Sequence, residues 1–307
     1  MPAVPADNPM SQPKVDLGRA LFFDTRLSLT GHYACASCHD PARAFSDGRR
    51  VALGATGQPL PHNAMALVNV AYNISFGWTR RAPRTLEAQM LEPMLNEHPV
   101  ELGLKHREAA LAAVLAADPA TRAAFAAAFP EDAAPVSFRH TVQAIAAFER
   151  TLISGGSPFD RYVFRGEHDA LSAEAKAGMA LFFSARAGCS ACHSGLNFAG
   201  NYRDAQGATG RASFARDGTA SAAMRVPTLR NLAYTAPYMH DGRFASLEEV
   251  LAHYSDLARS AARLPDRRLP RAPFSPAEER VLLAFLASLN DPAFTQLPGA
   301  PEQPPRP

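Results

Sequence analysis

Apolar residues recur at helical spacing along much of the chain, and the segment SLEEVLAHYSD, residues 246–256, shows the pattern clearly. Its apolar positions follow the i, i+3, i+4, i+7 rule and share one helical stripe. These positions are Leu247, Val250, Leu251 and Tyr254. Ser246 and Glu249 form a capping-box pair, so we expect the helix to begin at Leu247. On spacing alone, the phenol on this stripe indicates a hydrogen-bonded core tyrosine.

Helical patterns also cover much of the remaining sequence. The expected helices cover 108–115, a stretch from Pro119 onward, 136–152, and Ser275 to Leu289. The last of these opens with Ser-Pro-Ala-Glu, a capping box with proline at the first helical position. The Gly-, Asn- and Ala-rich segment 194–223 is expected to form loops, and the proline-rich tail 297–307 has a composition typical of disorder. The pattern predicts an all-α fold.

Composition narrows the class of protein. With 307 residues the chain has room for two domains of about 150 residues each. A hydrophobic content of 47% is typical of soluble globular proteins. No apolar run approaches the roughly 20 residues of a membrane span. The net charge of +2 comes from mixed signs, so neither nucleic acid nor a membrane surface is indicated as a partner. The opening MPAVPADNPM lacks the basic and apolar regions of a secretory signal, which leaves a cytoplasmic protein or one whose signal has been removed.

All four cysteines lie in two copies of the pattern C-x-x-C-H, the attachment motif of c-type haem. The two motifs are Cys35, Cys38 and His39, and Cys189, Cys192 and His193. Two thiols at this spacing can form thioethers to the vinyl groups of one porphyrin, and the adjacent histidine can bind the iron. Three alternative uses of the cysteines fit the sequence less well. Redox C-x-x-C pairs do not need a histidine at the next position, and structural disulfides would not explain the histidines either. Zinc ribbons place their two cysteine pairs much closer together than these clusters, which lie over 150 residues apart. We therefore expect two covalent haems. Because such attachment takes place outside the bacterial cytoplasm, we also expect a periplasmic protein whose signal peptide has been removed.

Both motifs follow a copy of the sequence G-x-A-L-F-F, within residues 17–23 and 177–183. Each copy predicts a short helix that leads into a haem loop, with paired phenylalanines available to pack on the porphyrin. The repeat indicates two duplicated cytochrome c-like domains. We expect an N-terminal haem domain over 14–155 and a C-terminal haem domain over 156–296, followed by the tail.

Beyond the haem motifs, the chain resembles the bacterial di-haem cytochrome c peroxidases, and more narrowly the MauG-like branch of that superfamily. The resemblance extends from about Asp16 to Leu289, and it rests on the block RVPTLRNLAYTAPYMHDGRFASLEEVLAHY, residues 225–254, and on HNAMALVNVAYNISFGW, residues 62–78. In this superfamily the helix after the TAPYMHDGR-like block supplies the sixth ligand of the C-terminal haem. Conventional peroxidases carry methionine there, whereas MauG-like members carry tyrosine. The resemblance implies that Tyr254 is that ligand, opposite His193.

This substitution changes the chemistry of the second haem. A thioether stabilises Fe(II), whereas a phenolate stabilises Fe(III) and higher oxidation states. Met239 lies near the same haem, and because both branches share it we interpret it as a packing residue. His240 and His253 are interpreted as exposed or propionate-bonded side chains.

The resemblance also implies an open coordination site on the first haem. The loop histidine that can close this site in conventional members is replaced by Ala55, and neither His32 nor His62 matches its position. A glutamate is needed to move a proton between the peroxide oxygens, and Glu101 is the candidate by position. The alternatives are Glu97 and Glu92, with His98 as a possible helper and Gln89 as a residue that shapes the pocket.

Trp78, the only tryptophan, matches a position that lies between the haems in the family and relays electrons there. The alternative is that Trp78 is a large buried side chain with a packing role alone. The resemblance further implies a calcium ion between the haem domains. Its expected ligands are Asn63, Thr235 and Pro237, since amide and carbonyl oxygens suit this ion.

Three functions are compatible with this pattern. The favoured one is a MauG-like enzyme in which hydrogen peroxide produces a bis-Fe(IV) state that oxidises residues of a partner protein at long range. The second is a peroxidase that takes electrons from a small redox protein, and the third is a non-catalytic electron carrier. MauG has a surface tryptophan two residues before its second haem motif, where this chain has Ala187, so the electron exit route differs. The similarity to the MbnH family implies oxidation of a partner tryptophan to kynurenine in the copper-binding protein MbnP.

Overall fold

A computed structural model describes residues 2, 4–79, 83–200, 214–215, 223–259, 268–270 and 272–296. Most of the expected loop 194–223 and the whole of the expected tail 297–307 lie outside these residues. Helices dominate the described chain, which confirms the all-α prediction. One two-stranded antiparallel pair is also present, formed by β1 (Phe214–Ala215) and β2 (Met224–Arg225).

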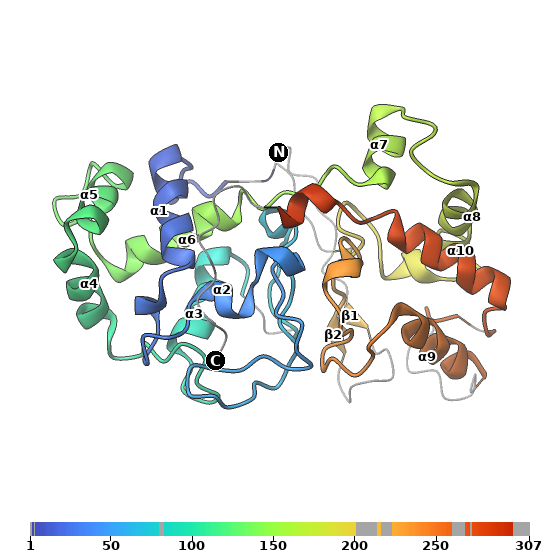
Figure 1. Cartoon of the computed structure of the whole chain (residues 1–307), viewed down its shortest axis with the longest axis horizontal. Coiled ribbons are helices and arrows are strands. Elements are labelled where there is room, and N and C mark those ends of the chain that lie inside the picture. The colour runs from blue at the N-terminus through green and yellow to red at the C-terminus, as the bar shows by residue number, and fades with distance from the viewer. Residues whose placement is uncertain are drawn as a thin grey trace.

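The helices form two groups that lie side by side in Figure 1. The first group comprises α1 (Gln12–Phe22), α2 (Cys35–Cys38), α3 (Leu86–Leu95), α4 (Glu108–Ala117), α5 (Pro119–Ala128) and α6 (Phe138–Glu149). The second comprises α7 (Pro158–Arg165), α8 (Ala173–Phe182), α9 (Leu247–Arg259) and α10 (Pro276–Ala287). Short 3-10 turns connect them at Thr25–Leu27, Pro41–Arg43, Val70–Tyr72, Cys189–Ala191, Leu232–Tyr234 and Pro292–Thr295.

Helix ends follow the capping residues. The Ser275 hydroxyl accepts the N–H of Glu278, whose carboxylate accepts the N–H of Ser275, so α10 begins where the capping box predicts. Helix α9 begins at Leu247 as expected. The helix expected over 136–152 is shorter: the Ser137 hydroxyl caps it, so α6 begins at Phe138, two residues later than expected, and it ends at Glu149.

The glycine of the repeated G-x-A-L-F-F sequence is the point of closest approach in both helix groups. A Cβ atom on Gly18 of α1 would lie 1.8 Å from the Ala144 carbonyl oxygen of α6. A Cβ atom on Gly178 of α8 would lie 1.8 Å from the Val281 carbonyl oxygen of α10. Only a residue without a side chain allows these backbones to meet. The same crossing at the same repeat position confirms two related cytochrome c-like units.

Each crossing lies within its own apolar core. Phe22 and Ile145 are fully buried in the first core, and Leu282 and Phe285 are almost fully buried in the second. Phe294, from the C-terminal segment, packs into the first core. The expected domain boundaries stay a prediction.

Asp291 ties the segment between the two helix groups to the C-terminal end of the chain. Its buried carboxylate accepts the N–H groups of Gly155 and Gly156 at 3.1 and 2.8 Å and the Ser154 hydroxyl at 3.3 Å. Three donors on one carboxylate fix this segment where it passes from one core to the other.

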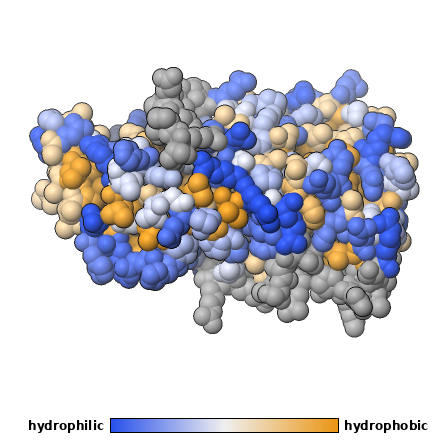
Figure 2. All heavy atoms as spheres, turned by 60° about the horizontal axis from the view of Figure 1, so that its bottom comes forward, coloured by the Kyte–Doolittle hydropathy of each residue, from blue (hydrophilic) through white to orange (hydrophobic). Residues whose placement is uncertain are grey.

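Hydrophobic and hydrophilic side chains are interspersed on the face shown in Figure 2. Within the described part of the chain, no single helix is long and apolar enough to cross a membrane. Helices α4 and α5 reach that length only when taken together, and they meet at a bend of 108°.

Candidate functional site

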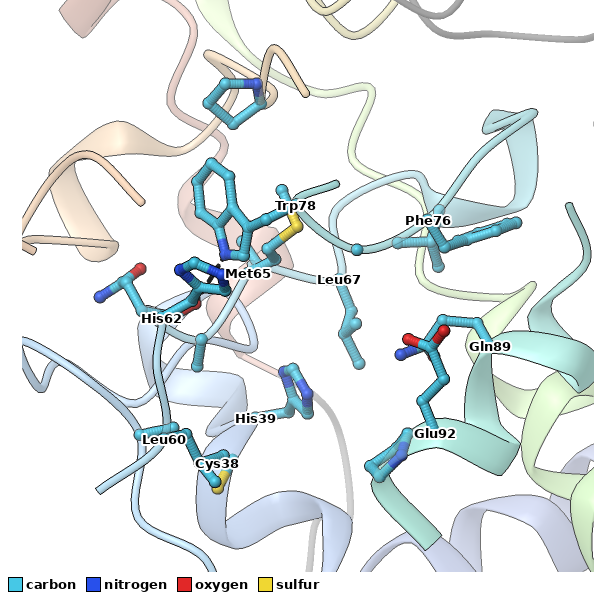
Figure 3. A pocket seen from close by; sticks show the side chains of 18 of the residues that line it. Cys38, His39, Leu60, His62, Met65, Leu67, Phe76, Trp78, Gln89 and Glu92 are labelled. Atoms are coloured by element: carbon cyan, nitrogen blue, oxygen red, sulfur yellow. Dashed lines mark hydrogen bonds between the residues drawn. The ribbon is translucent and has the colours of Figure 1, made fainter. Parts of the chain in front are cut away.

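The first C-x-x-C-H motif borders a cavity of about 400 Å³ between the two helix groups. Helix α2 presents Cys35 and Cys38 to this cavity, and His39 follows directly (Figure 3). The Nδ1 atom of His39 lies 2.9 Å from the Phe45 carbonyl oxygen. This bond orients the ring and leaves Nε2 as the nitrogen that can bind a metal. Burial lowers the pKa of His39, which favours the neutral imidazole that such binding requires.

The second motif repeats this arrangement at a second cavity. Cys189, Cys192 and His193 line it, and the Nδ1 atom of His193 lies 2.8 Å from the Phe198 carbonyl oxygen. In both motifs the carbonyl bonded to Nδ1 comes from a phenylalanine five or six residues further along the chain. Each histidine is therefore held in the orientation of an iron ligand.

The thiols fit covalent attachment better than redox chemistry. All four cysteines are free. Burial raises the pKa of Cys38 and of Cys189 to about 12 each, and it also raises the pKa of Cys35. Redox-active C-x-x-C pairs need a thiol whose pKa is lowered toward neutrality. The residues of each cavity thus suit a c-type haem bound through two thioethers and one histidine.

Tyr254 lies in the wall of the second cavity. The apolar stripe of α9 faces this cavity, since Leu247, Val250 and Leu251 line it together with Tyr254. The tyrosine is half-buried and packs against the second core, so its phenol ring borders both packed side chains and the cavity. The structure therefore brings Tyr254 and His193 to one cavity, and the role of Tyr254 as the sixth ligand stays a prediction.

The paired phenylalanines behave differently in the two halves. Phe182 lines the second cavity, but Phe22 and Phe23 do not line the first. The ring of Phe22 packs edge-to-face on Phe45 and Phe148 in the core, at 5.9 and 5.2 Å between centroids. Phe183 does not line the second cavity either, so Phe182 is the one ring of the four that borders a cavity. Packing of these phenylalanines on a porphyrin stays a prediction.

Glu101 lines the first cavity, as do Gln89 and Glu92, which Figure 3 shows on α3. Burial and the nearby Glu92 carboxylate raise the pKa of Glu101 to about 7. Glu97 is exposed and pairs with Lys105 at 2.5 Å, away from the cavity wall. Of these two candidates for the acid–base group, Glu101 therefore lines the cavity and Glu97 does not.

The backbone around Glu101 is held by the loop that carries Ala55. The Ala55 N–H donates to the Glu101 carbonyl oxygen at 2.6 Å, and a Cβ atom on Gly54 would lie 1.9 Å from the Val100 carbonyl oxygen. Neither His32 nor His98 lines the cavity. His62 does line it, although from the side of Trp78.

Trp78 borders both cavities, together with Met239. The indole N–H donates to the Asn63 carbonyl oxygen at 3.0 Å. The rings of His62 and His240 lie 6.4 and 6.3 Å from the indole centroid, and 5.6 Å from each other. The site expected to lie between two haems is therefore a cluster of three aromatic rings.

His240 is buried, with 8% of its surface exposed, so the interpretation of this residue as exposed is wrong. His240 lines the second cavity, and its carbonyl oxygen accepts the Asn63 N–H at 2.8 Å. His253 is half-buried, and its ring lies 5.2 Å from that of Phe244. Propionate bonding by either histidine stays a prediction.

The three residues expected to bind calcium come from two segments, one of which supplies two of them, and all three line the first cavity. They are Asn63, Thr235 and Pro237. The Asn63 amide donates to the Arg49 carbonyl oxygen at 2.8 Å, which orients its side chain. Among the described residues no group of three or more His, Cys, Asp or Glu side chains is placed to hold a metal ion. A cation here would rely on amide and carbonyl oxygens, which are hard ligands of the type that calcium accepts.

Several charged residues that line the cavities were not identified from the sequence, among them Glu149 and Arg225. Glu149 is buried at the end of α6, and one of its carboxylate oxygens makes no hydrogen bond. Burial and the Glu87 carboxylate raise the pKa of Glu149 to about 8, against the opposing effect of Arg150. The sequence signal that could have identified Glu149 is its place at the end of the otherwise apolar run AIAAFE, which suggests a buried carboxylate. Arg225, in β2, lines both cavities.

Comparisons with known proteins agree with this arrangement. The sequence model of the di-haem cytochrome c peroxidase family matches residues 12–169. The methylamine utilization protein MauG of Methylorubrum extorquens is 39% identical, over 97% of this chain and 84% of its own. The cytochrome c551 peroxidase of Pseudomonas aeruginosa is 31% identical, over 97% of this chain and 86% of its own. Among solved structures, a MauG-like protein associated with microbial copper homeostasis superposes with a TM-score of 0.91 at 34% identity, covering 98% of this chain and 96% of that one.

Proposed function

Because the chain belongs to the di-haem cytochrome c peroxidase family that includes MauG, we propose that it uses hydrogen peroxide to oxidise residues of a partner protein. The family implies two haems and a haem-dependent oxidoreductase. When bound, the haems supply peroxide activation and the storage of oxidising equivalents. The steps below concern the residues of this chain.

The observation that carries the proposal is the presence of Tyr254 in the same cavity as His193. A phenolate is a hard, anionic ligand, and it favours oxidised iron over the reduced iron that a thioether favours. With haems bound, His193 and Tyr254 would hold the second iron in a form that suits the storage of oxidising equivalents, as the proposed bis-Fe(IV) state requires. This form is less suited to supplying electrons for peroxide reduction.

Glu101 is the acid–base group for peroxide at the first cavity. Its carboxylate takes the proton from one peroxide oxygen and returns it to the other as the O–O bond breaks. The raised pKa allows both protonation states near neutral pH. Ala55 offers no side chain that could bind a haem iron, so the space beside Glu101 would be left open to peroxide.

Trp78 relays electrons between the cavities that it borders. Asn63, Thr235 and Pro237 would hold a calcium ion, which would stabilise the same region. Electrons reach the second cavity from the partner protein. Ala187 is fully buried, so the exit route does not use a surface residue at that position.

The partner is a periplasmic copper-binding protein of the MbnP type, in which a tryptophan is converted to kynurenine. The support for this assignment is the similarity to the MauG-like protein associated with copper homeostasis.

The test is the addition of stoichiometric hydrogen peroxide to the diferric holoenzyme without reductant, followed by Mössbauer and near-infrared spectroscopy. We expect two Fe(IV) signals and a charge-resonance band in the wild type. The Tyr254→Met variant should lose the band and react only after one haem is reduced. A wild-type protein that requires pre-reduction would instead identify a conventional peroxidase and overturn the proposal.

A further inference from the structure

Arg225 is a buried cation at the place where the two cavities meet. Only 6% of its surface is exposed, and it lines both cavities. Its Nε donates to the Gly77 carbonyl oxygen at 2.6 Å, and its Nη2 lies 2.7 Å from the Met65 sulfur. A thioether is a weak acceptor, so it compensates little for the loss of water around a charged group.

No carboxylate among the residues that the structure describes forms an ion pair with Arg225. Burial lowers the pKa of its guanidinium to about 10, which still leaves it charged at neutral pH. Burying a charge without an opposite charge is costly, so such groups are normally paired or hydrogen-bonded to an anion.

Arg230, five residues further along the chain, shows how this fold treats a buried arginine whose partner is a protein group. Its guanidinium forms two parallel bonds to the Asp160 carboxylate at 2.8 and 2.9 Å. Arg230 and Arg225 are similarly buried, but only Arg230 has its carboxylate within the described chain. The contrast indicates that the partner of Arg225 is an anion that binds in the cavities.

The chemistry of that anion follows from the cysteines. Cys35 and Cys38 fix the vinyl edge of a porphyrin in the first cavity, and Cys189 and Cys192 do so in the second. The opposite edge of each porphyrin carries two propionate carboxylates. A guanidinium is a planar fork of donors that matches carboxylates, and here two of its donors are already used, leaving the others for the cavities.

We propose that the Arg225 guanidinium pairs with haem propionates at the junction of the two cavities and acts as a positioning residue between the haems. The proposal rests on the two-haem part of the function above, and it is independent of the protein substrate.

The same residue holds the backbone on both sides of the Trp78 α-carbon. The Arg225 N–H donates to the Trp78 carbonyl oxygen at 2.8 Å, and its side chain binds the carbonyl of Gly77. The propionate pair thereby couples the position of the haems to that of the indole between them. A cation next to a propionate also favours the reduced haem, because it offsets the negative charge that reduction adds.

The experiment is a spectroelectrochemical titration of the holoenzyme and of three variants, at one pH where carboxylates are ionised. We expect Arg225→Gln to lower the equilibrium constant for reduction of at least one haem by about tenfold or more, which is about 59 mV for a one-electron couple. Arg225→Lys keeps the charge and should recover part of this change. Arg280→Gln is the matched control, since Arg280 is an exposed arginine paired with Glu174 at 3.2 Å, and it should leave both potentials unchanged.

If Arg225→Gln contains both haems and both reduction potentials equal those of the wild type, Arg225 is only a packing residue. If Arg225→Gln does not bind haem, resonance Raman spectra of Arg225→Lys decide instead. Propionate bending bands shifted from the wild type support the pair, and unchanged bands overturn it. The potentials and bands do not depend on peroxide, so they are independent of whether the holoenzyme oxidises a protein.

Discussion

Replacing Glu101 with glutamine tests the acid–base role of this residue most directly. Glutamine retains the size of the side chain but cannot take up a proton. Positioned general acid–base groups typically contribute about 10²- to 10⁴-fold to a rate, so we expect Glu101→Gln to slow the reaction with peroxide by that factor. The haem content and the visible spectrum of the resting protein should not change, because Glu101 faces the cavity rather than the core.

The pH dependence follows from the environment of the residue. The pKa of Glu101 is raised to about 7, so the carboxylate that accepts the first peroxide proton forms as the pH rises through that value. The ionised fraction increases roughly tenfold between pH 6 and pH 8, and the rate should rise in proportion. Glu92 contributes to the raised pKa through charge repulsion, so Glu92→Gln should move the midpoint of the profile toward lower pH.

The assay is stopped-flow absorption of the diferric holoenzyme mixed with peroxide over a series of pH values. Glu97→Gln is the matched control, because Glu97 is an exposed glutamate that pairs with Lys105 outside the cavity. A Glu101→Gln variant that reacts at the wild-type rate, or that keeps the inflection near neutral pH, would refute the reasoning.

Two further predictions concern stability, measured by denaturant unfolding. Gly178→Ala should lower the free energy of unfolding by about 3 kcal/mol, because its new Cβ would lie 1.8 Å from the Val281 carbonyl oxygen. Gly155→Ala is the control. Its new Cβ would have nothing within 4 Å, so the free energy of unfolding should change by less than about 0.5 kcal/mol. Asp160→Asn should cost about 3–5 kcal/mol, since it leaves the buried Arg230 guanidinium without its carboxylate; unfolding at the wild-type denaturant concentration would contradict this.

Local signals in the sequence predicted much of the fold. The helix that begins at Leu247 and the one that follows Ser275 start at capping residues, and caps act within one helical turn. The haem motifs are equally local, since three residues of each lie within five positions. Both features could therefore be identified without knowledge of tertiary structure.

Other parts of the site depend on contacts between distant segments. Glu97 and Glu101 are four residues apart, and their different environments depend on tertiary contacts: Glu101 bonds to the Ala55 loop through its backbone, and Glu97 pairs with Lys105. The glycine in the repeat was visible in the sequence, but its function at a helix crossing required the position of α6 and α10. Arg225 looks like an ordinary polar residue in the sequence, because only the fold shows that none of the described carboxylates pairs with it.

The position of Trp78 makes the junction of the two cavities observable by light. It is the only tryptophan among 307 residues, and it borders both cavities. Tryptophan emission of the whole protein therefore originates at this one place. Haem absorbs in the region where tryptophan emits, so energy transfer quenches the emission when a haem is nearby. Because Trp78 borders both cavities, a haem in either one should quench its emission. The residual brightness of a preparation therefore measures the fraction of molecules in which both cavities are empty.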